Sequence, residues 1–405
     1  MKLSPFAISV NALGLTQITA WGTSFYCLGV LAKPIGAETG WAMSTIFLGF
    51  SIALVVMGVI STTVGRLIDR IGARTVMSIG TVIVSAGLFG LSRVHDVATY
   101  FVAWAAIGVG MRCCLYDATF AALVQVVPGR GRLAISYLTL YGAYASTVFW
   151  VIGHYLNVGY GWRGTLVIFA LINLAICLPL NWFGLTWRET APAEAEKPAA
   201  TSVEGPVLEG RGRIVGIALF ALIMSLNGFV FGVVSLQLVP LLEAAGLAGA
   251  AAVWVASLKG HGQFGGRVVE IFFARNLKAM TVARIAIAVV PAALLILMLA
   301  RGQVWQLVAF TLLLGASQGV ITIVRGAVPL ALFGAKGYGA VLGLIATPIL
   351  LVNAFSPTLF ALIVDQIGWH NGLYALLACS LLTLIAMELM SRWYERARAG
   401  YTRPA

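Results

Sequence analysis

The feature that most constrains this chain is a series of apolar runs that are each long enough to cross a lipid bilayer. A membrane-spanning helix needs about 20 predominantly apolar residues. Charged residues make up only 10% of the 405 residues and hydrophobic residues make up 60%, whereas a soluble protein has about 25% charged residues. So little charge cannot cover the surface of a soluble domain, which excludes soluble, fibrous and disordered classes. We expect an all-α polytopic protein in contact with the bilayer, with twelve spans at about residues 8–32, 42–64, 75–92, 98–125, 134–156, 164–186, 214–238, 248–273, 281–300, 304–332, 339–363 and 371–391.

One long polar stretch divides the apolar runs into six and six. Residues 188–213 carry three prolines and mixed charges, a composition typical of a flexible connector. The predicted organisation is therefore two pseudo-symmetric six-helix bundles in a monomer. Its expected parts are an N-terminal bundle (1–187), a cytoplasmic linker (188–213), a C-terminal bundle (214–392) and a cytoplasmic tail (393–405).

Positive charge predicts the orientation of these spans. Of 26 Lys and Arg residues, 18 fall in segments that share a membrane side with the N-terminus, and only four fall in the opposite loops. Cytoplasmic segments are the ones enriched in Lys and Arg, so both termini are expected in the cytoplasm and the protein in the inner membrane. The formal net charge of +12 is thereby explained by topology, and no nucleic-acid partner is expected.

An internal repeat supports the division into halves. Gly65–Arg74 (GRLIDRIGAR) matches Gly266–Arg275 (GRVVEIFFAR) at an offset of 201, and the acid keeps its place as Asp69 and Glu270. Gly161-Trp-Arg likewise recurs as Gly368-Trp-His at an offset of 207. Two equally oriented six-helix halves are the parallel repeat of one class of transporters.

The segment Gly65–Arg74, between the second and third predicted spans, resembles the signature loop of the major facilitator superfamily. The resemblance implies that the protein is a transporter and not an enzyme. Such a transporter binds a small-molecule substrate and works by alternating access. It also implies that the acid pairs with arginines and a helix N-terminus to close the cytoplasmic side. The residues carried over to this gating role are Asp69, Arg70 and Arg74, with Glu270 and Arg275 in the second copy.

A finer resemblance concerns the start of the second span. Glu38–Trp41 (ETGW), followed by Ser44 and Phe50-Ser51, is similar to the monocarboxylate and oxalate–formate branch. Two positions depart from related branches. Trp104 stands where proton-coupled drug antiporters have an arginine, and Gly262 stands where the monocarboxylate branch has one.

Four charged residues lie at membrane depth: Arg112, Asp117, Lys259 and Arg325. Each costs about 2.5–3.5 kcal/mol there unless it faces a cavity or a partner. On a continuous helix, Arg112 and Asp117 would be about 140° apart and poor partners for each other. We therefore expect Asp117 to pair with Arg325 of the opposite half and to hold the cytoplasmic side shut. Local pairing of each charge for structure is the alternative.

The same depth suggests a substrate site. Arg112 and Lys259 would give a cavity positive potential that favours an anion, while His261 or Asp117 could take up a proton during transport. The other expected substrate contacts are Tyr116, which shares a helix face with Arg112, Thr23 in a polar stripe of the first span, and Asn227. The alternative is that these residues pack, hydrogen-bond between helices, or extend toward the interface as Lys does.

Two functions remain open from the sequence. The first is secondary transport of a small organic anion, monocarboxylate-like and proton-linked. The second is efflux of toxic small molecules, including a trivalent metalloid bound by the adjacent thiols of Cys113 and Cys114. The sequence has neither a nucleotide-binding Gly-x-x-x-x-Gly-Lys-Ser/Thr loop nor Cys/His metal spacing, so we expect no cofactor and no resident metal.

Overall fold

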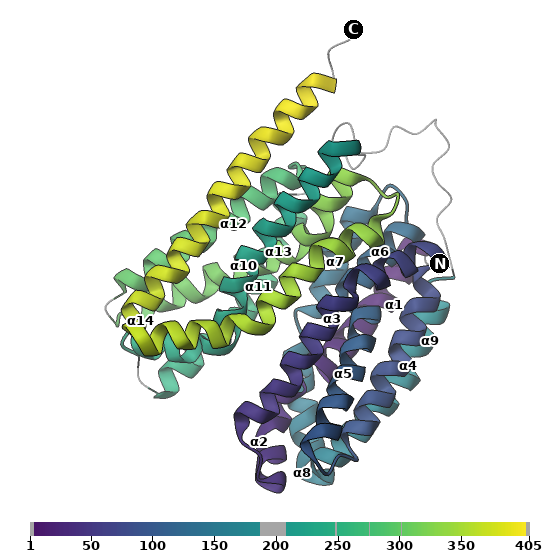
Figure 1. Cartoon of the computed structure of the whole chain (residues 1–405), viewed down its shortest axis with the longest axis vertical. Helices are drawn as coiled ribbons and strands as arrows, with labels where there is room; N and C mark the ends of the chain where they lie inside the picture. The colour runs from purple at the N-terminus through teal and green to yellow at the C-terminus, as the bar shows by residue number, and fades with distance from the viewer. Residues whose placement is uncertain (1–3, 187–207, 248, 275, 301, 402–405) are drawn as a thin grey trace. The chain divides into compact units, whose positions relative to one another are not determined.

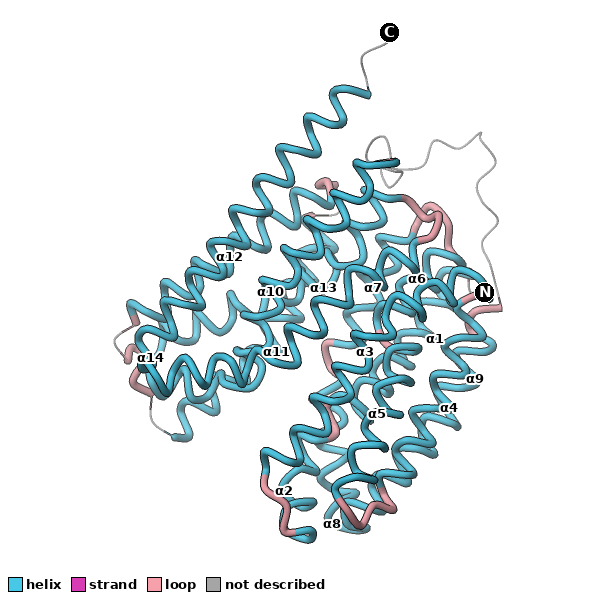
Figure 2. Tube along the Cα trace, in the orientation of Figure 1, coloured by secondary structure: helices cyan, strands magenta, loops and turns pink. Residues whose placement is uncertain are grey.

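The structure, a computed structural model, describes residues 4–186, 208–247, 249–274, 276–300 and 302–401. These residues form helices joined by short turns, and none of them forms a strand (Figure 2). Most of the predicted connector at 188–213 and the predicted gating residue Arg275 lie outside the described residues. The predicted tail is helical where it is described, because the last helix extends to Tyr401.

Contacts between Cα atoms divide the chain into two compact units. The first comprises residues 1–199 and 337–347, and the second comprises 200–336 and 348–405. The first unit contains α1 (Pro5–Ala20), a π-helical turn η1 (Trp21–Phe25), α2 (Leu28–Thr39), α3 (Met43–Ile71), α4 (Ala73–Leu91), α5 (Val97–Cys114), α6 (Tyr116–Val126), α7 (Gly131–Gly142), α8 (Ala145–Ile172), a second π-helical turn η2 (Asn173–Cys177) and α9 (Leu178–Phe183) (Figure 1). The second contains α10 (Gly210–Ala244), α11 (Gly249–Phe273), α12 (Ala279–Leu299), α13 (Val304–Phe333) and most of α14 (Tyr338–Tyr401).

Eight helical stretches within the described residues are long and apolar enough to cross a membrane. Two of them, 131–183 and 338–397, are 53 and 60 residues long and reverse at a glycine, so each supplies two passes. The first apolar run, which η1 interrupts, and α11, whose polar residues lower its hydropathy, complete the predicted set of twelve. The all-α polytopic fold is thus confirmed.

The two reversals lie at positions that the internal repeat makes equivalent. Gly161 has φ 66° and ψ 173°, and Gly368 has φ 81° and ψ 163°. A positive φ is strained for residues with a Cβ atom but open to glycine. The repeat in the sequence therefore corresponds to a repeated backbone conformation.

A polar clasp joins three helix ends of the first unit beside Gly161. Glu38 accepts hydrogen bonds from Trp162 Nε1 at 2.7 Å and from Arg163 Nε at 2.8 Å. Arg163 also donates to the Ser92 carbonyl at 2.8 Å. The branch-like residue Glu38 thus has a structural role in this unit, since it ties the end of α2 to the end of α4 and to the reversal inside α8.

The clasp predicts a small acid sensitivity. The hydrogen bond from Arg163 lowers the pKa of Glu38 below its usual value, so the clasp stabilises the fold above that usual value and loses this contribution as the pH falls through the lowered pKa. Because the Glu38 side chain is 52% exposed, we expect Glu38→Gln to cost less than about 1 kcal/mol at neutral pH. Thermal unfolding at pH 7 and near pH 3 should show the difference from wild type only at pH 7, and an equal difference at both would contradict the assignment.

Candidate functional site

The fourth predicted span is broken in the middle. Leu115 has φ −82° and ψ −167°, an extended conformation that ends α5 and begins α6. The break places Arg112 in the last turn of α5 and Asp117 in the first turn of α6. Each charge then suits the local helix dipole, since cations are stabilised at helix C-termini and anions at N-termini.

The break brings Arg112 and Asp117 together. Arg112 Nη1 lies 3.2 Å from Asp117 Oδ2, and the two side chains are only 2% and 7% exposed. Arg112 Nε also donates to Ser61 Oγ of α3 at 2.6 Å. The expectation that these two charges would be poor partners was wrong, because it assumed a continuous helix.

A side chain of α1 donates a hydrogen bond to a backbone carbonyl at the helix break. The carbonyl of Cys114 accepts hydrogen bonds from Gln17 Nε2 at 2.9 Å and from the Thr119 hydroxyl at 3.3 Å. Gln17 is fully buried and also contacts Trp21, whose Nε1 donates to Gln17 Oε1 at 3.1 Å. Such partners are required because a buried carbonyl left unpaired costs about 1–3 kcal/mol.

Aromatic rings of α6, η1 and α3 form a continuous series that begins at Tyr116, the residue next to Asp117. The Tyr116 ring lies 4.9 Å from that of Trp21 and stacks on Phe120 at 5.3 Å, centroid to centroid. Trp21 continues to Phe25 at 4.8 Å and Phe25 to Phe50 of α3 at 4.9 Å. Tyr116, Trp21, Phe25 and Phe50 all keep part of their surface exposed, so Tyr116 belongs to an accessible aromatic wall.

Thr23 has a different environment from the one expected of a substrate contact. It is fully buried in η1, where its hydroxyl donates to the Thr19 carbonyl at 2.8 Å and accepts from Asn173 Nδ2 at 2.7 Å. Asn173 begins the other π-helical turn, η2. The hydroxyl therefore joins the two irregular turns, in agreement with the alternative that the polar stripe bonds helices to one another.

The second unit contains a cation in the middle of α11. Lys259 Nζ lies 3.4 Å from Ser235 Oγ and 5.3 Å from the centroid of the Phe231 ring, both in α10. The described residues place no carboxylate within ion-pair distance of Lys259. Among the described residues, the ammonium group thus contacts a hydroxyl and an aromatic face, and the ring attracts the cation electrostatically.

The remaining candidates of the second unit are spread over three helices. His261 is exposed. It follows Lys259 by two positions in α11, which puts the two side chains about 200° apart around the helix. Asn227 of α10 and Arg325 of α13 are both half-buried. The structure does not join His261 and Lys259 into one site.

Helix α10 of this unit bends where it contacts α14. Gln237 departs from helical geometry (φ −112°, ψ 17°) and donates to the Pro357 carbonyl at 3.0 Å. Pro357 removes the N–H that would bond the Asn353 carbonyl, and the Ser356 hydroxyl donates to that carbonyl at 3.3 Å. Sequence reasoning did not identify Gln237 as part of this bend.

The signature segment is helical rather than a loop. Residues 65–71 belong to the end of α3, and Gly72 alone, with φ 88°, connects them to α4. Asp69 accepts hydrogen bonds from the backbone N–H groups of Gly339 at 2.9 Å and Ala340 at 2.7 Å. These free N–H groups open α14, so the acid neutralises the positive end of that helix.

Small residues allow this contact. A Cβ on Gly65 would lie 2.1 Å from the Gly339 carbonyl oxygen, and one on Gly343 would lie 2.5 Å from the Ser61 carbonyl oxygen. The start of α14 therefore packs directly on the α3 backbone, as small residues permit between membrane helices. This contact explains why residues 337–347 group with the first unit.

The other signature residues have separate surroundings. Arg70 is exposed, and Arg74 lies over the Trp182 ring at 4.0 Å from its centroid. Glu270 and Arg267 are buried within α11, and Arg267 Nε donates to the Gly319 carbonyl at 3.3 Å. Among the gating candidates of the signature, Asp69 is the one whose carboxylate caps the start of α14.

The adjacent thiols face protein rather than open space. Cys113 and Cys114 are 6% and 3% exposed, and the Cys113 Cβ lies against Gly80 of α4. Nor do the described residues contain a group of three or more His, Cys, Asp or Glu side chains able to hold a metal ion. Both observations favour packing over metalloid binding at these cysteines.

The fold and these buried charges define a polytopic helical transporter, and comparison with known proteins gives its family. The family model described as "Major Facilitator Superfamily" matches residues 15–302. The chain therefore belongs to the major facilitator superfamily. It is accordingly a multi-pass membrane protein of a family whose members transport small molecules and are not enzymes.

Curated relatives match over part of the chain. They are an uncharacterized MFS-type transporter, YcxA, of Bacillus subtilis (26% identical over 49% of this chain and 49% of the relative), a multidrug resistance protein, MdtL, of Shewanella oneidensis (24%, 46% and 46%) and human monocarboxylate transporter 6 (26%, 38% and 30%). The match spans half or less of the length of each relative.

Solved structures share the fold over nearly the whole chain. The human organic anion transporter MFSD10 superposes with a TM-score of 0.75 at 15% identity, covering 95% of this chain and 100% of that one. The transporter FucP in its outward conformation gives 0.72 at 13% identity, covering 95% and 99%. At these identities the likeness concerns the fold alone.

Proposed function

We propose that the protein is a secondary active transporter of a small organic anion, with both termini on the cytoplasmic side of the inner membrane. The observation that supports an anionic substrate is the environment of Lys259, a cation at the centre of α11. Among the described residues, its side chain contacts a hydroxyl and an aromatic ring. Lys259 is half-buried, and a cation at membrane depth without a carboxylate partner is costly, so an anionic substrate would offset that cost. A relative named as a monocarboxylate transporter adds support.

The Arg112–Asp117 pair is the proposed coupling element. In the ion-paired state Asp117 neutralises the charge of Arg112. The pair then offers little net positive charge to an anion. Protonation of Asp117 would release the guanidinium to a carboxylate substrate beside Tyr116. A proton and an anion would then move together, as in a proton-linked symporter.

Asp69 supports a proposal for gating. Its two hydrogen bonds to the first turn of α14 fix α14 to α3 on the side predicted to be cytoplasmic. Release of these bonds would free the start of α14 to move during alternating access. The pairing of Asp117 with Arg325 across the halves stays a prediction.

The anion proposal predicts a specific loss in the Lys259→Ala variant. A stabilisation screen of carboxylates against the purified protein first identifies a ligand, because binding raises the unfolding temperature. For that ligand, Lys259→Ala should raise the apparent KM for uptake about tenfold or more, the effect of losing one charged contact. Lys278→Gln, which removes an exposed cation ahead of α12, is the matched control and should leave KM unchanged. An unchanged KM in Lys259→Ala would contradict the proposal.

Efflux of toxic small molecules is the second candidate, favoured by the relative named as a multidrug resistance protein. The same variants separate the two functions. Drug resistance conferred on a pump-deficient host, with no carboxylate ligand found and no effect of Lys259→Ala, would support efflux over anion transport.

A further inference from the structure

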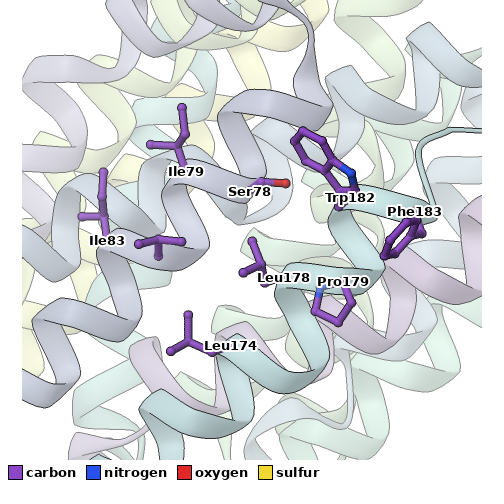
Figure 3. A pocket seen from close by; sticks show the side chains of 9 residues that line it. Ser78, Ile79, Ile83, Leu174, Leu178, Pro179, Trp182 and Phe183 are labelled. Carbon is purple, nitrogen blue, oxygen red and sulfur yellow. The ribbon is translucent and has the colours of Figure 1, made fainter.

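An open apolar groove runs along the first unit between α4 and the segment η2–α9. It has a volume of about 680 Å³. In Figure 3, α4 contributes Ser78 and Ile79 to one side, and the following segment contributes Leu178 and Trp182 to the other. None of the residues that line the groove takes part in the Arg112, Lys259 or Asp69 sites, although Arg74 at its end belongs to the same signature segment as Asp69.

The walls of this groove are apolar and face outward. Val82, Trp182 and Phe183 are 46%, 42% and 65% exposed. An apolar surface of this kind in a membrane protein is suited to hydrocarbon, and a hollow suits a chain better than a flat contact does.

One end of the groove is polar and positively charged. The Arg74 guanidinium lies over the Trp182 ring at 4.0 Å from its centroid. Arg74 Nε and Ser78 Oγ are both buried atoms for which the described residues provide no hydrogen-bond partner. The Ser78 side chain is only 6% exposed, and its oxygen points into the groove toward Trp182 (Figure 3). Two donors without acceptors at the end of an apolar groove call for an anionic oxygen.

The groove is longer than the hydrocarbon part of one leaflet. A second hollow shares Val82 and Leu174 with the first and extends to Phe89. From Arg74 to Phe89 the helix rises about 22 Å, compared with about 15 Å for half of the hydrocarbon core. An acyl chain anchored at Arg74 would therefore have a groove along its whole length.

We propose that this groove binds an anionic phospholipid, with its phosphate at Arg74 and Ser78 and one acyl chain along α4. Arg74 lies on the side that the distribution of Lys and Arg predicts to be cytoplasmic, where anionic headgroups are concentrated and basic pockets between helices bind them. The inference does not depend on which substrate is transported.

The test compares dioleoylphosphatidylglycerol with dioleoylphosphatidylcholine, each added to the purified full chain in detergent, with binding followed by native mass spectrometry and the unfolding temperature. Wild type should bind the anionic lipid about fivefold or more tightly, and Arg74→Gln should abolish this preference. Arg66→Gln is the matched control, because Arg66 is an exposed cation in the same signature segment and should keep the preference.

A second variant tests the groove itself. Val82→Trp fills it at an exposed position and should reduce binding of the anionic lipid without lowering the unfolding temperature of the lipid-free protein. Equal affinity for the two lipids, or equal losses in Arg74→Gln and Arg66→Gln, would overturn the proposal. Stabilisation by glycerol 3-phosphate as strong as that by the lipid would assign the site to a free phosphate and would also overturn it.

Discussion

Asp117→Asn should destabilise the protein by about 3–5 kcal/mol, because it leaves the buried Arg112 guanidinium without its counter-charge. Both side chains are less than a tenth exposed, so water cannot replace the lost carboxylate. The measurement is thermal or denaturant unfolding of the purified protein in detergent. Glu38→Gln, which removes the acid of the half-exposed pair with Arg163, is the matched control and should cost less than about 1 kcal/mol.

Removing both charges distinguishes the pair from a general effect at this position. Arg112→Met combined with Asp117→Leu should regain most of the stability lost in Asp117→Asn, because a buried ion pair often contributes little over an apolar replacement. The double variant should nevertheless fail to transport if the pair is the coupling element. A loss in Asp117→Asn no larger than that of Glu38→Gln would show that the pair is not formed in the protein.

Gly65→Ala should reduce transport at least tenfold. The added Cβ would lie 2.1 Å from the Gly339 carbonyl oxygen, and because this neighbour is backbone, α3 and α14 must separate. Overpacking of this kind costs about 1–3 kcal/mol, and it also lengthens the hydrogen bonds from Gly339 and Ala340 to Asp69. Uptake into cells or proteoliposomes, normalised to the amount of folded protein, measures the effect.

The control for this variant is Gly90→Ala near the end of α4. A Cβ at Gly90 meets no atom within 4 Å, so this change should leave transport intact and, by helix propensity, stabilise slightly if at all. Transport by Gly65→Ala at the wild-type rate would mean that the close contact of α3 and α14 has no part in the cycle.

The predicted spans agree with the helices because the hydrophobicity that places a helix in the membrane is set by the residues of that helix alone. The signature was equally informative, since the position of Asp69 four residues after Gly65 places its carboxylate beside the free N–H groups of α14. The spans and the contact of the acid with a helix N-terminus could be predicted because a local sequence pattern carries the physical cause of each, whereas the gating role of Asp69 stays a prediction.

The break at Leu115 had no comparable signal. The surrounding residues, Cys113 to Asp117, include neither proline nor glycine, and a continuous helix was the natural expectation. The break is compensated by Gln17, which lies 97 residues away in the chain and bonds the Cys114 carbonyl. For the same reason the sequence left open whether Thr23 contacts substrate or another helix, since its partner Asn173 lies 150 residues away.

By itself, the sequence determined that the chain is a helical membrane protein with repeated halves, because span length, charge bias and the repeat are local or periodic properties. Only the tertiary structure decided which buried charges meet. Arg112 and Asp117 become partners through a helix break that distant side chains stabilise, while Lys259 has no carboxylate within ion-pair distance among the described residues. The cost of burying a charge is readable in sequence, but the group that offsets it is set by how the helices pack.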